Sequence, residues 1–587
     1  MKNFFTTLLA SILGVILASL IMFFIFLGVI SAIVSRQEKP INIKSNTVLV
    51  LPLDRPVVDR KSNLPILNVG LQNLGVGMQI GLNDILNVIS NAKSDSNISG
   101  IYLELSDLEA GTATIEEIRN ALLDFRESGK FVVAFSDTYS QAAYYLASAS
   151  DKIFMNPTGY IEFVGLSAQV MFYRETLEKL EIEPEITRHG EFKSAVEPFM
   201  YDHMSDPNRE QIRVYMNSIW DHVVGEISES RNIPVDVLND YADRLDMWKT
   251  TAAVDNGLLD ASIYKDQVMD TLACLLNQCG NTDIRSVSYD DYLRVPKRSG
   301  GYSKDKIAVI YASGDIVMGA GPDGSIGSES MSKAIREARK DSTVKAIVFR
   351  VNSGGGSALA SEVIWRELEL ARKVKPVIAS MGDVSASGGY YILTQADTVL
   401  ASPVTITGSI GVFGLTVNAE DFLNNKLGIH VDVERTNDYS DFGSIYRPLA
   451  PREKEVLQHF VDEVYDTFVM RVADGRKLLF QEVDAIGQGR VWSGSNALDL
   501  HLVDMMGGLS DAIDIAADKA GLENYRIVEL PEVEDPFTRL MNEFKTGIRE
   551  KLLTNALKEN YNRLKSLEEV LGNDRIQARM PFTVKVD

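Results

Sequence analysis

The chain has 587 residues, too many for one hydrophobic core, so the sequence predicts two or more domains. The formal net charge of −22 and the absence of a strongly basic segment argue against a nucleic-acid ligand, because binding phosphates needs a basic surface. A hydrophobic fraction of 45% is that of an ordinary globular protein.

Residues 1–40 predict a transmembrane anchor. No charged residue occurs between Lys2 and Arg36, and this apolar stretch is longer than the roughly 20 residues that cross a bilayer as a helix. A cleaved secretory signal is the alternative, but its apolar region would be only about 7 to 15 residues long. The basic residues Arg36, Lys39 and Lys44 after the span favour a cytoplasmic body, although long domains cross membranes regardless of such charges.

The chain after the anchor predicts two copies of one α/β domain, over residues 45–300 and 301–530. Each copy has a strand pattern, a helix pattern, a further strand, a turn and a second helix, which is the order of βαβ units in a parallel sheet. The matching segments are 47–55 with 305–315, 100–107 with 346–353, 114–129 with 359–374, and 130–137 with 375–383. The sequence is therefore a tandem repeat.

Longer amphipathic helices follow in each copy. Residues 206–231 and 450–476 have helical spacing of their apolar residues and correspond to each other. Residues 531–587 predict a C-terminal helical tail, either solvated or in contact with another subunit.

The two cysteines, Cys274 and Cys279, are too few for a disulfide framework or a four-ligand zinc site. Two buried thiols in one helix are the favoured expectation, and a local disulfide formed in an oxidising compartment is the alternative. The sequence predicts neither a metal site nor a cofactor.

Two sequence segments occur in both copies, and each differs between the copies at one chemically important position. "DVSASGGYYILTQAD" (383–397) has Ser387 where "DTYSQAAYYLASASD" (137–151) has Gln141. "HGEFKSAVEPF" (189–199) has Lys193 where "YSDFGSIYRPL" (439–449) has Gly443. The first copy keeps the lysine and the second keeps the serine, which predicts one composite site between the copies.

A serine and a lysine together can carry out acyl transfer. The hydroxyl of Ser387 needs a base to remove its proton, and a neutral Lys193 amine is such a base. The lysine pKa of about 10.4 would have to fall to about 7 or 8, a change of about 4 kcal/mol, which burial in an apolar pocket can supply. Phe192, Ala195, Val196 and Phe199 near the lysine fit such a pocket.

Backbone amides for the oxyanion are expected in the turn "RVNSGGGSA" (350–358), at Gly355 and Gly356, and at Gly388 beside the serine. Glycines let a substrate approach the backbone closely, and the opening of a helix favours negative charge. A purely structural turn is the alternative. However, the first copy has "SDLEAGT" at this place, without the run of glycines.

A histidine is the alternative base. None of the six histidines has a recognisable aspartate partner in the sequence, and His189, four residues before Lys193, is the one candidate worth testing.

Four segments follow one another along the chain: "GEFKSAVEPF", "VNSGGGSA", "SASGGYY" and "TGSIGVFG" (407–414). As an ordered set they resemble the signal peptide peptidase A family, also called protease IV, in its long duplicated bacterial form. The resemblance implies that Ser387 is the nucleophile, that Lys193 is the general base and that Ser409 hydrogen-bonds the lysine amine. Gly354 stands where the family usually has proline, which leaves open which glycine amide binds the oxyanion.

The resemblance further implies a fold similar to the caseinolytic protease and crotonase superfamily and a homotetramer. It implies a single-pass protein of the bacterial inner membrane whose catalytic body is periplasmic. Its substrates would be released signal peptides and other apolar peptides, and its other partner would be membrane lipid.

The leading hypothesis is thus a membrane-anchored serine endopeptidase with a Ser/Lys dyad and an acyl-enzyme intermediate. Acyl-CoA chemistry on a crotonase-like fold is a second hypothesis, and it predicts that Ser387→Ala has no effect. A membrane scaffold without catalysis is a third, and it predicts that a serine-directed acylating probe does not label Ser387.

Overall fold

The computed structural model describes residues 41–61, 79–106, 108–281, 283–295, 303–532 and 576–579, together with parts of 11–25. Across these ranges no helix is both long and apolar enough to cross a membrane. Most of the predicted anchor over residues 1–40 lies outside the described residues, so the anchor stays a prediction.

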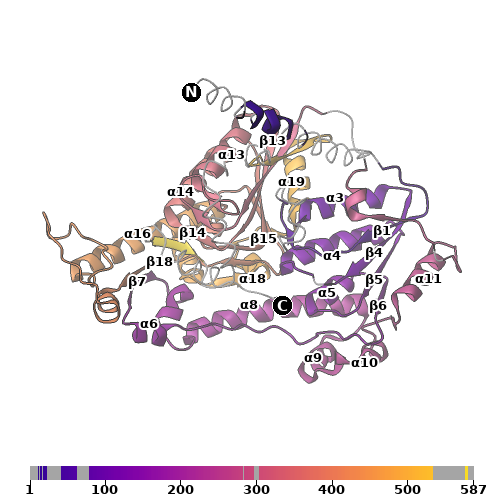
Figure 1. The fold of residues 1–587 in the computed structure, drawn as a ribbon, viewed down its shortest axis with the longest axis horizontal. Helices are drawn as coiled ribbons and strands as arrows, with labels where there is room; N and C mark the ends of the chain where they lie inside the picture. Colours follow the sequence, from indigo (N-terminus) through magenta and orange to yellow (C-terminus); the bar gives the residue numbers. More distant parts are fainter. Residues whose placement is uncertain are drawn as a thin grey trace.

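The first repeat is built on a six-stranded parallel sheet (Figure 1). Its strand order is β8 (Ala261–Ser262), β6 (Lys152–Met155), β5 (Phe131–Ser136), β4 (Ile98–Leu105), β1 (Thr47–Leu51) and β9 (Ser286–Ser288). The helices around it are α3 (Leu82–Ser94), α4 (Thr112–Arg126), α5 (Gln141–Ala147), α8 (Asp206–Arg231), α9 (Val235–Arg244), α10 (Thr250–Asp255), α11 (Lys265–Leu275) and α12 (Tyr289–Tyr292). Apolar strands such as β1, TVLVL, are buried because helices cover the faces of a parallel sheet.

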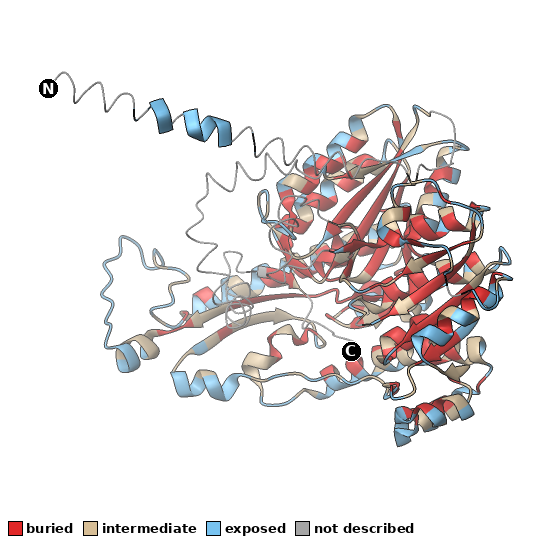
Figure 2. Cartoon of the chain, turned by 45° about the vertical axis from the view of Figure 1, so that its right-hand side comes forward, coloured by how far each residue is buried: buried red, intermediate tan, exposed pale blue. Residues whose placement is uncertain are grey.

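The second repeat has a corresponding eight-stranded sheet. Its main order is β19 (Val491–Ser493), β17 (Ile406–Gly408), β15 (Val377–Ala386), β13 (Val344–Ser353), β10 (Lys306–Ser313) and β21 (Arg526–Leu530). In addition, β16 (Thr398–Ala401) pairs with β15, and β20 (Met505–Met506) pairs with β16. The helices are α13 (Ser328–Lys340), α14 (Ala358–Arg372), α15 (Gly388–Tyr391), α16 (Pro451–Arg476), α17 (Phe480–Ile486), α18 (Gly494–Asp499) and α19 (Leu509–Ala520). Figure 2 shows the strands of both main sheets as largely buried.

The predicted tandem repeat is confirmed by this architecture. The strands β1, β4 and β5 match β10, β13 and β15 in order and pairing. The long helices α8 and α16 have 26 residues each, and both have a proline in the first turn and end at a residue in the left-handed conformation, Asn232 and Lys477. The likeness to the caseinolytic protease and crotonase fold stays a prediction.

A third sheet joins the two repeats. Its order is β12 (Ile326–Gly327), β11 (Ile316–Val317), β14 (Gly355–Ser357), β22 (Ile576–Arg579), β18 (Val412–Asn418) and β7 (Glu183–His189). Strand β7 comes from the first repeat and pairs antiparallel with β18 of the second over seven residues. This pairing carries the chain just after His189 into the second repeat.

Buried charges also connect the repeats. Arg350 on β13 contacts Asp59 at 2.8 Å and Glu117 at 2.7 Å, and all three side chains are buried. Asp383 on β15 accepts hydrogen bonds from the amide and the hydroxyl of Thr114 at 2.9 and 2.8 Å. The repeats therefore share a fixed interface.

Two expectations need correction. Cys274 and Cys279 form a disulfide, and the prediction of two buried thiols in one helix is wrong, because α11 ends at Leu275 and both cysteines are exposed. Within the predicted helical tail, Ile576–Arg579 is a strand, since it pairs with strands on both sides. Residues 533–575 and 580–587 lie outside the described residues.

Candidate active site

Lys193 lies four residues after β7 and reaches into the second repeat. The amide of Phe192 donates to the carbonyl of Gln488 at 2.9 Å, which docks the turn against the second repeat. Gly489 has a φ of +80°, and a Cβ there would lie 2.7 Å from the Cα of Lys193. Only glycine leaves room for the lysine backbone at this point.

Ser387 lies where β15 ends and the short helix α15 begins. Its φ of 54° and ψ of −119° are unusual for a residue with a side chain and mark a sharp turn from strand to helix. The amide of Ser387 donates to the carbonyl of Gly408 at 2.8 Å, and the amide of Tyr391 donates to the carbonyl of Ser387 at 2.8 Å. These bonds hold the strained residue in place.

The structure brings Lys193, Ser387 and Ser409 together. The Nζ atom of Lys193 lies 2.9 Å from Oγ of Ser387 and 3.1 Å from Oγ of Ser409. It also lies 3.4 Å from the carbonyl oxygen of Ser409, and all three residues are fully buried. Ser409 follows β17 and has a φ of 49°, so two of the three residues have a strained backbone.

The lysine amine lies in an environment that disfavours its charged form. Burial lowers the pKa of Lys193 well below its ordinary value of 10.5, and no carboxylate among the described residues opposes this effect. The ring of Phe413, whose centroid is 6.0 Å from Nζ, lies on one side, and Val196 packs against Phe413. The sequence pointed to apolar neighbours before and after Lys193, whereas Phe413 comes from the second repeat.

The glycine turn lies next to the serine. A Cβ on Gly355 would come within 2.7 Å of the amide nitrogen of Gly388, the residue after Ser387. The amide of Gly355 itself donates to Oγ of Ser353 at 3.1 Å. Gly355 therefore provides space beside the amide of Gly388, while its own amide already has an acceptor. Gly356, the next residue, has a φ of 151° and lies on β14, which pairs with β22.

The positions that correspond to Ser387 and Lys193 in the other repeat are Gln141 and Gly443, which offer neither a hydroxyl nor an amine. Gln141 begins α5, and its side chain binds the next loop through three hydrogen bonds with the backbone of Val164 and Gly165. Gly443 lies in a largely exposed segment and has a φ of 74°. Gln141 thus has a structural role.

His189 pairs with a carboxylate that sequence reasoning missed. Its Nδ1 lies 2.7 Å from Oδ1 of Asp462 on α16, and its ring stacks on Tyr465. The two residues are 273 positions apart, so no local pattern could reveal the pair. Among the described side chains, the basic group at hydrogen-bonding distance from Ser387 is Lys193.

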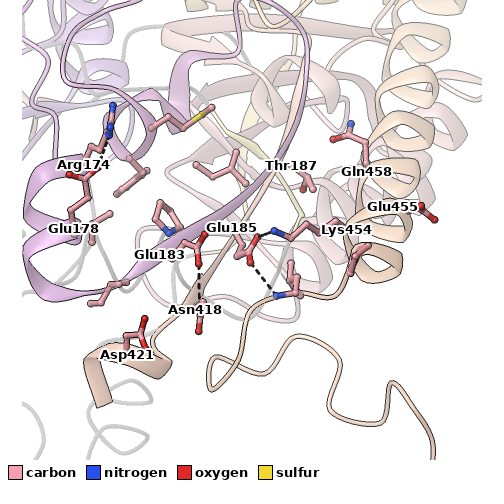
Figure 3. A pocket seen from close by; sticks show the side chains of 18 of the residues that line it. Arg174, Glu178, Glu183, Glu185, Thr187, Asn418, Asp421, Lys454, Glu455 and Gln458 are labelled. Carbon is pink, nitrogen blue, oxygen red and sulfur yellow. Dashed lines mark hydrogen bonds and ion pairs between the residues drawn. The ribbon is translucent and has the colours of Figure 1, made fainter. Parts of the chain in front are cut away.

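A separate hollow, whose lining includes none of the three residues of the site, lies between β7, β18, α16 and α6 (Arg174–Leu180) (Figure 3). Two of its carboxylates have partners: Glu185 contacts Lys454 at 2.7 Å and accepts from the amide of Leu449, and Glu183 contacts Asn418. These paired groups give no sign of acid or base chemistry.

Comparison with known proteins gives a consistent result. The model of "Peptidase family S49" matches residues 124–278 and 369–523, once in each repeat. Protease 4 of Salmonella typhi is 38% identical over 498 residues, covering 82% of this chain and 79% of the relative. Protease 4 of Haemophilus influenzae is 33% identical over 561 residues and 91% of each chain. The chloroplastic serine protease SPPA of Arabidopsis thaliana is 33% identical over 456 residues, covering 76% of this chain and 67% of the relative.

Proposed function

The chain belongs to peptidase family S49 and is a serine-type peptidase, and we propose that Ser387 is its nucleophile and Lys193 its general base. The observation that carries this assignment is the distance of 2.9 Å between Nζ and Oγ inside a fully buried site. A nucleophile and a base within hydrogen-bonding distance are the minimum that acyl transfer requires.

The proposed cycle uses each group at a defined atom. The neutral amine of Lys193 takes the proton of Ser387, and Oγ attacks the carbonyl carbon of the scissile bond. The lysine then gives the proton to the leaving amine, and water releases the acyl-enzyme by the same steps in reverse order. Ser409 accepts from or donates to the amine and keeps it aimed at the serine.

The oxyanion would bind at the amide of Gly388, beside the nucleophile. Gly388 is the first residue of α15, and its amide lies beside Gly355, which has no side chain there. A carbonyl oxygen of the substrate can therefore reach the amide of Gly388. Gly356 stays a predicted second contributor. Because the amide of Gly355 donates to Ser353, the role that fits Gly355 is to provide space.

The proposed substrates are released signal peptides and other apolar peptides bound in extended form. Support comes from the apolar surroundings of the lysine and from the strands β14 and β18 beside the site, whose backbones pair with an extended segment. A peptide that displaces water there would help to keep the amine uncharged.

The proposed location is a bacterial inner membrane, with a single span over residues 1–40, lipid around that span and the catalytic body in the periplasm. The disulfide between Cys274 and Cys279 supports an oxidising compartment, where such bonds persist. A homotetramer is part of the same proposal, and a size measurement on the full chain in detergent tests it.

A peptidase assay on the full chain in detergent tests the dyad. Ser387→Ala and Lys193→Ala should each lower kcat for an apolar peptide by at least about 100-fold, because each removes one partner of the proton transfer. Lys375→Ala is the matched control, since Lys375 is a partly buried lysine whose amine donates to the backbone carbonyls of Ala338 and Asp341, away from the site.

The assignment fails if either Ser387→Ala or Lys193→Ala keeps normal turnover. Labelling by a serine-directed acylating probe gives an independent readout. The wild type should be labelled at Ser387. The Lys193→Ala variant should be labelled at least about ten times more slowly, because its serine lacks the base. Normal hydrolysis by Ser387→Ala would favour acyl-CoA-type chemistry that uses only the oxyanion site.

A further inference from the structure

Helix α8 crosses the boundary between the repeats. It belongs to the first repeat, yet it packs against β19 and α18 of the second repeat (Figure 1). Two of its side chains bond to β19: Oε1 of Gln211 accepts from the amide of Val491 at 3.0 Å, and Oγ of Ser218 lies 2.7 Å from Oγ of Ser493. The helix is therefore docked on a strand of the repeat that contains the serine of the site.

The side chain of Gln211 also holds the turn that contains Lys193. Its Nε2 donates to the carbonyl of Phe192, the residue before the lysine, and to Oγ of Ser194, the residue after it, at 3.0 Å each. A third contact joins Nε2 to Oδ1 of Asn208 at 3.1 Å, one turn earlier on α8. A backbone carbonyl can only accept and a backbone amide can only donate, so these partners fix the orientation of the side-chain amide.

The position of Gln211 is closed to water. Gln211, Lys193 and Val491 are all fully buried. A buried side-chain amide costs free energy unless its polar atoms are hydrogen-bonded, and the buried stripe of an amphipathic helix is normally apolar. Here both ends of the amide have partners, and those partners belong to different repeats. The side chain thus joins the lysine turn to β19.

Strand β19 is in turn tied to the strand that holds the nucleophile. Val491 lies opposite Gly408 in the antiparallel pair of β19 and β17. The carbonyl of Gly408 accepts from the amide of Ser387 at 2.8 Å. A short series of hydrogen bonds and strand pairs therefore runs from the lysine turn through Gln211, β19 and β17 to Ser387.

The other repeat lacks this glutamine together with the lysine. Helices α8 and α16 have 26 residues each, so Gln211, the sixth residue of α8, corresponds to Val456, the sixth residue of α16. The side chain of Val456 has no hydrogen-bonding group, and the residue is 45% exposed. The same repeat has Gly443 where the first has Lys193. The glutamine thus accompanies the base, as expected for a residue that serves it.

We propose that Gln211 is a positioning residue for the general base, because it holds the backbone on both sides of Lys193 against β19. In this way it keeps Nζ at hydrogen-bonding distance from Ser387 and away from water. The inference rests on the proposed function, since it takes Lys193 as the base. Nζ itself bonds to Ser387 and Ser409, so Gln211 acts through the lysine turn.

Charged groups near the turn have partners of their own among the described residues. Glu197 accepts from the side chain of Asn208 at 2.8 Å, and Arg490 contacts Glu210 at 2.8 Å. Burial is the cause that lowers the pKa of Lys193. If the turn loses its anchor and water reaches the amine, this pKa should rise toward its ordinary value.

The pH dependence of peptide hydrolysis by the full chain in detergent tests this role. Gln211→Met nearly keeps the length of the side chain but removes its hydrogen bonds. It should lower kcat at neutral pH at least about tenfold with little change in KM, and move the rising part of the kcat/KM profile to higher pH by about one unit or more. A loss of folded protein alone would not move the profile. Rates are expressed per serine labelled when the acylating probe has reacted to completion.

Matched variants separate this effect from general ones. Gln141→Met removes another buried glutamine, whose hydrogen-bond partners all belong to the first repeat. Ser218→Ala removes the other hydrogen bond described above between α8 and β19. Both variants should keep the wild-type profile. Ser194→Ala removes one of the two bonds from Gln211 to the turn, so it should shift the profile in the same direction by a smaller amount.

Three results would overturn the inference: a Gln211→Met variant with the kcat and profile of the wild type, a loss of kcat without a shift of the profile, and an equal shift in either control. If Gln211→Met does not fold, an unshifted profile of Ser194→Ala overturns it. The proposed function survives these results as long as Ser387→Ala and Lys193→Ala are inactive. Normal turnover by either of these last two variants would instead overturn the proposed function and this inference with it.

Discussion

Lys193 and Ser387 are 194 positions apart and belong to different repeats, yet their side-chain atoms Nζ and Oγ lie 2.9 Å apart. The antiparallel pairing of β7 with β18 makes this possible, because it carries the lysine of the first repeat into the second. Each repeat alone therefore lacks half of the proposed dyad.

The first prediction concerns the pH dependence of the rate. Because burial lowers the pKa of Lys193, the reactive neutral amine should form well below pH 10.5. We expect kcat/KM to rise with pH and to level off above the pKa of the free enzyme's lysine. A rate profile that stays flat down to about pH 4 would contradict a lysine base, because a base that is still unprotonated at that pH has the pKa of a carboxylate.

The same pKa affects stability. The folded lysine binds its proton more weakly than the unfolded one, so the unfolded chain holds more protons between the folded pKa and 10.5. In that window the free energy of unfolding should rise with pH by about 1.4 kcal/mol per pH unit from this residue. Lys193→Met should remove this contribution and be more stable than the wild type near neutral pH. Denaturant unfolding at several pH values measures it, and equal slopes in both proteins would contradict the buried neutral amine.

Ser409 should act by positioning the lysine. Its Oγ lies 3.1 Å from Nζ, and the neutral amine becomes charged when it takes the serine proton. Losing a hydrogen bond of about 1.5 to 3 kcal/mol to that charged form should lower kcat of Ser409→Ala about 10- to 100-fold with little change in KM. The matched control is Ser385→Ala, which removes another buried hydroxyl whose partner is the carbonyl of Val351. If both variants lose kcat equally, the effect is structural and not specific to Ser409.

Restoring a serine to the first repeat should not restore activity. Gln141→Ser in a Ser387→Ala background should remain as inactive as Ser387→Ala alone, because the position that corresponds to Lys193 is Gly443 in a largely exposed segment. Peptide hydrolysis by the double variant measures this outcome. A gain of more than about tenfold would mean that the first repeat can supply its own base.

Removing Arg350 should strongly destabilise the interface between repeats. Arg350→Met leaves the buried carboxylates of Asp59 and Glu117 without their cation, which costs about 3 to 5 kcal/mol. Burial already raises the pKa of Glu117, and without Arg350 the folded variant should hold protons that the unfolded chain has released. Its free energy of unfolding should therefore fall as pH rises from about 4 to about 8. A change below about 1 kcal/mol at neutral pH would show that water or rearrangement compensates the carboxylates.

The sequence by itself determined the tandem repeat and the βαβ order, and it singled out Lys193 and Ser387 as candidates for one composite site. Local apolar periodicity decides strands and helices, and a duplicated phrase shows which copy has kept a reactive residue. In the same way, the strand-to-helix turn at Ser387 follows from short-range residue order.

Only the tertiary structure decided which groups meet. Phe413 beside the amine, Asp462 beside His189 and the carbonyl of Ala578 beside Gly355 all depend on contacts between distant segments. Such contacts are fixed by strand register and by close packing across the repeats, and neither leaves a periodic signal in the sequence.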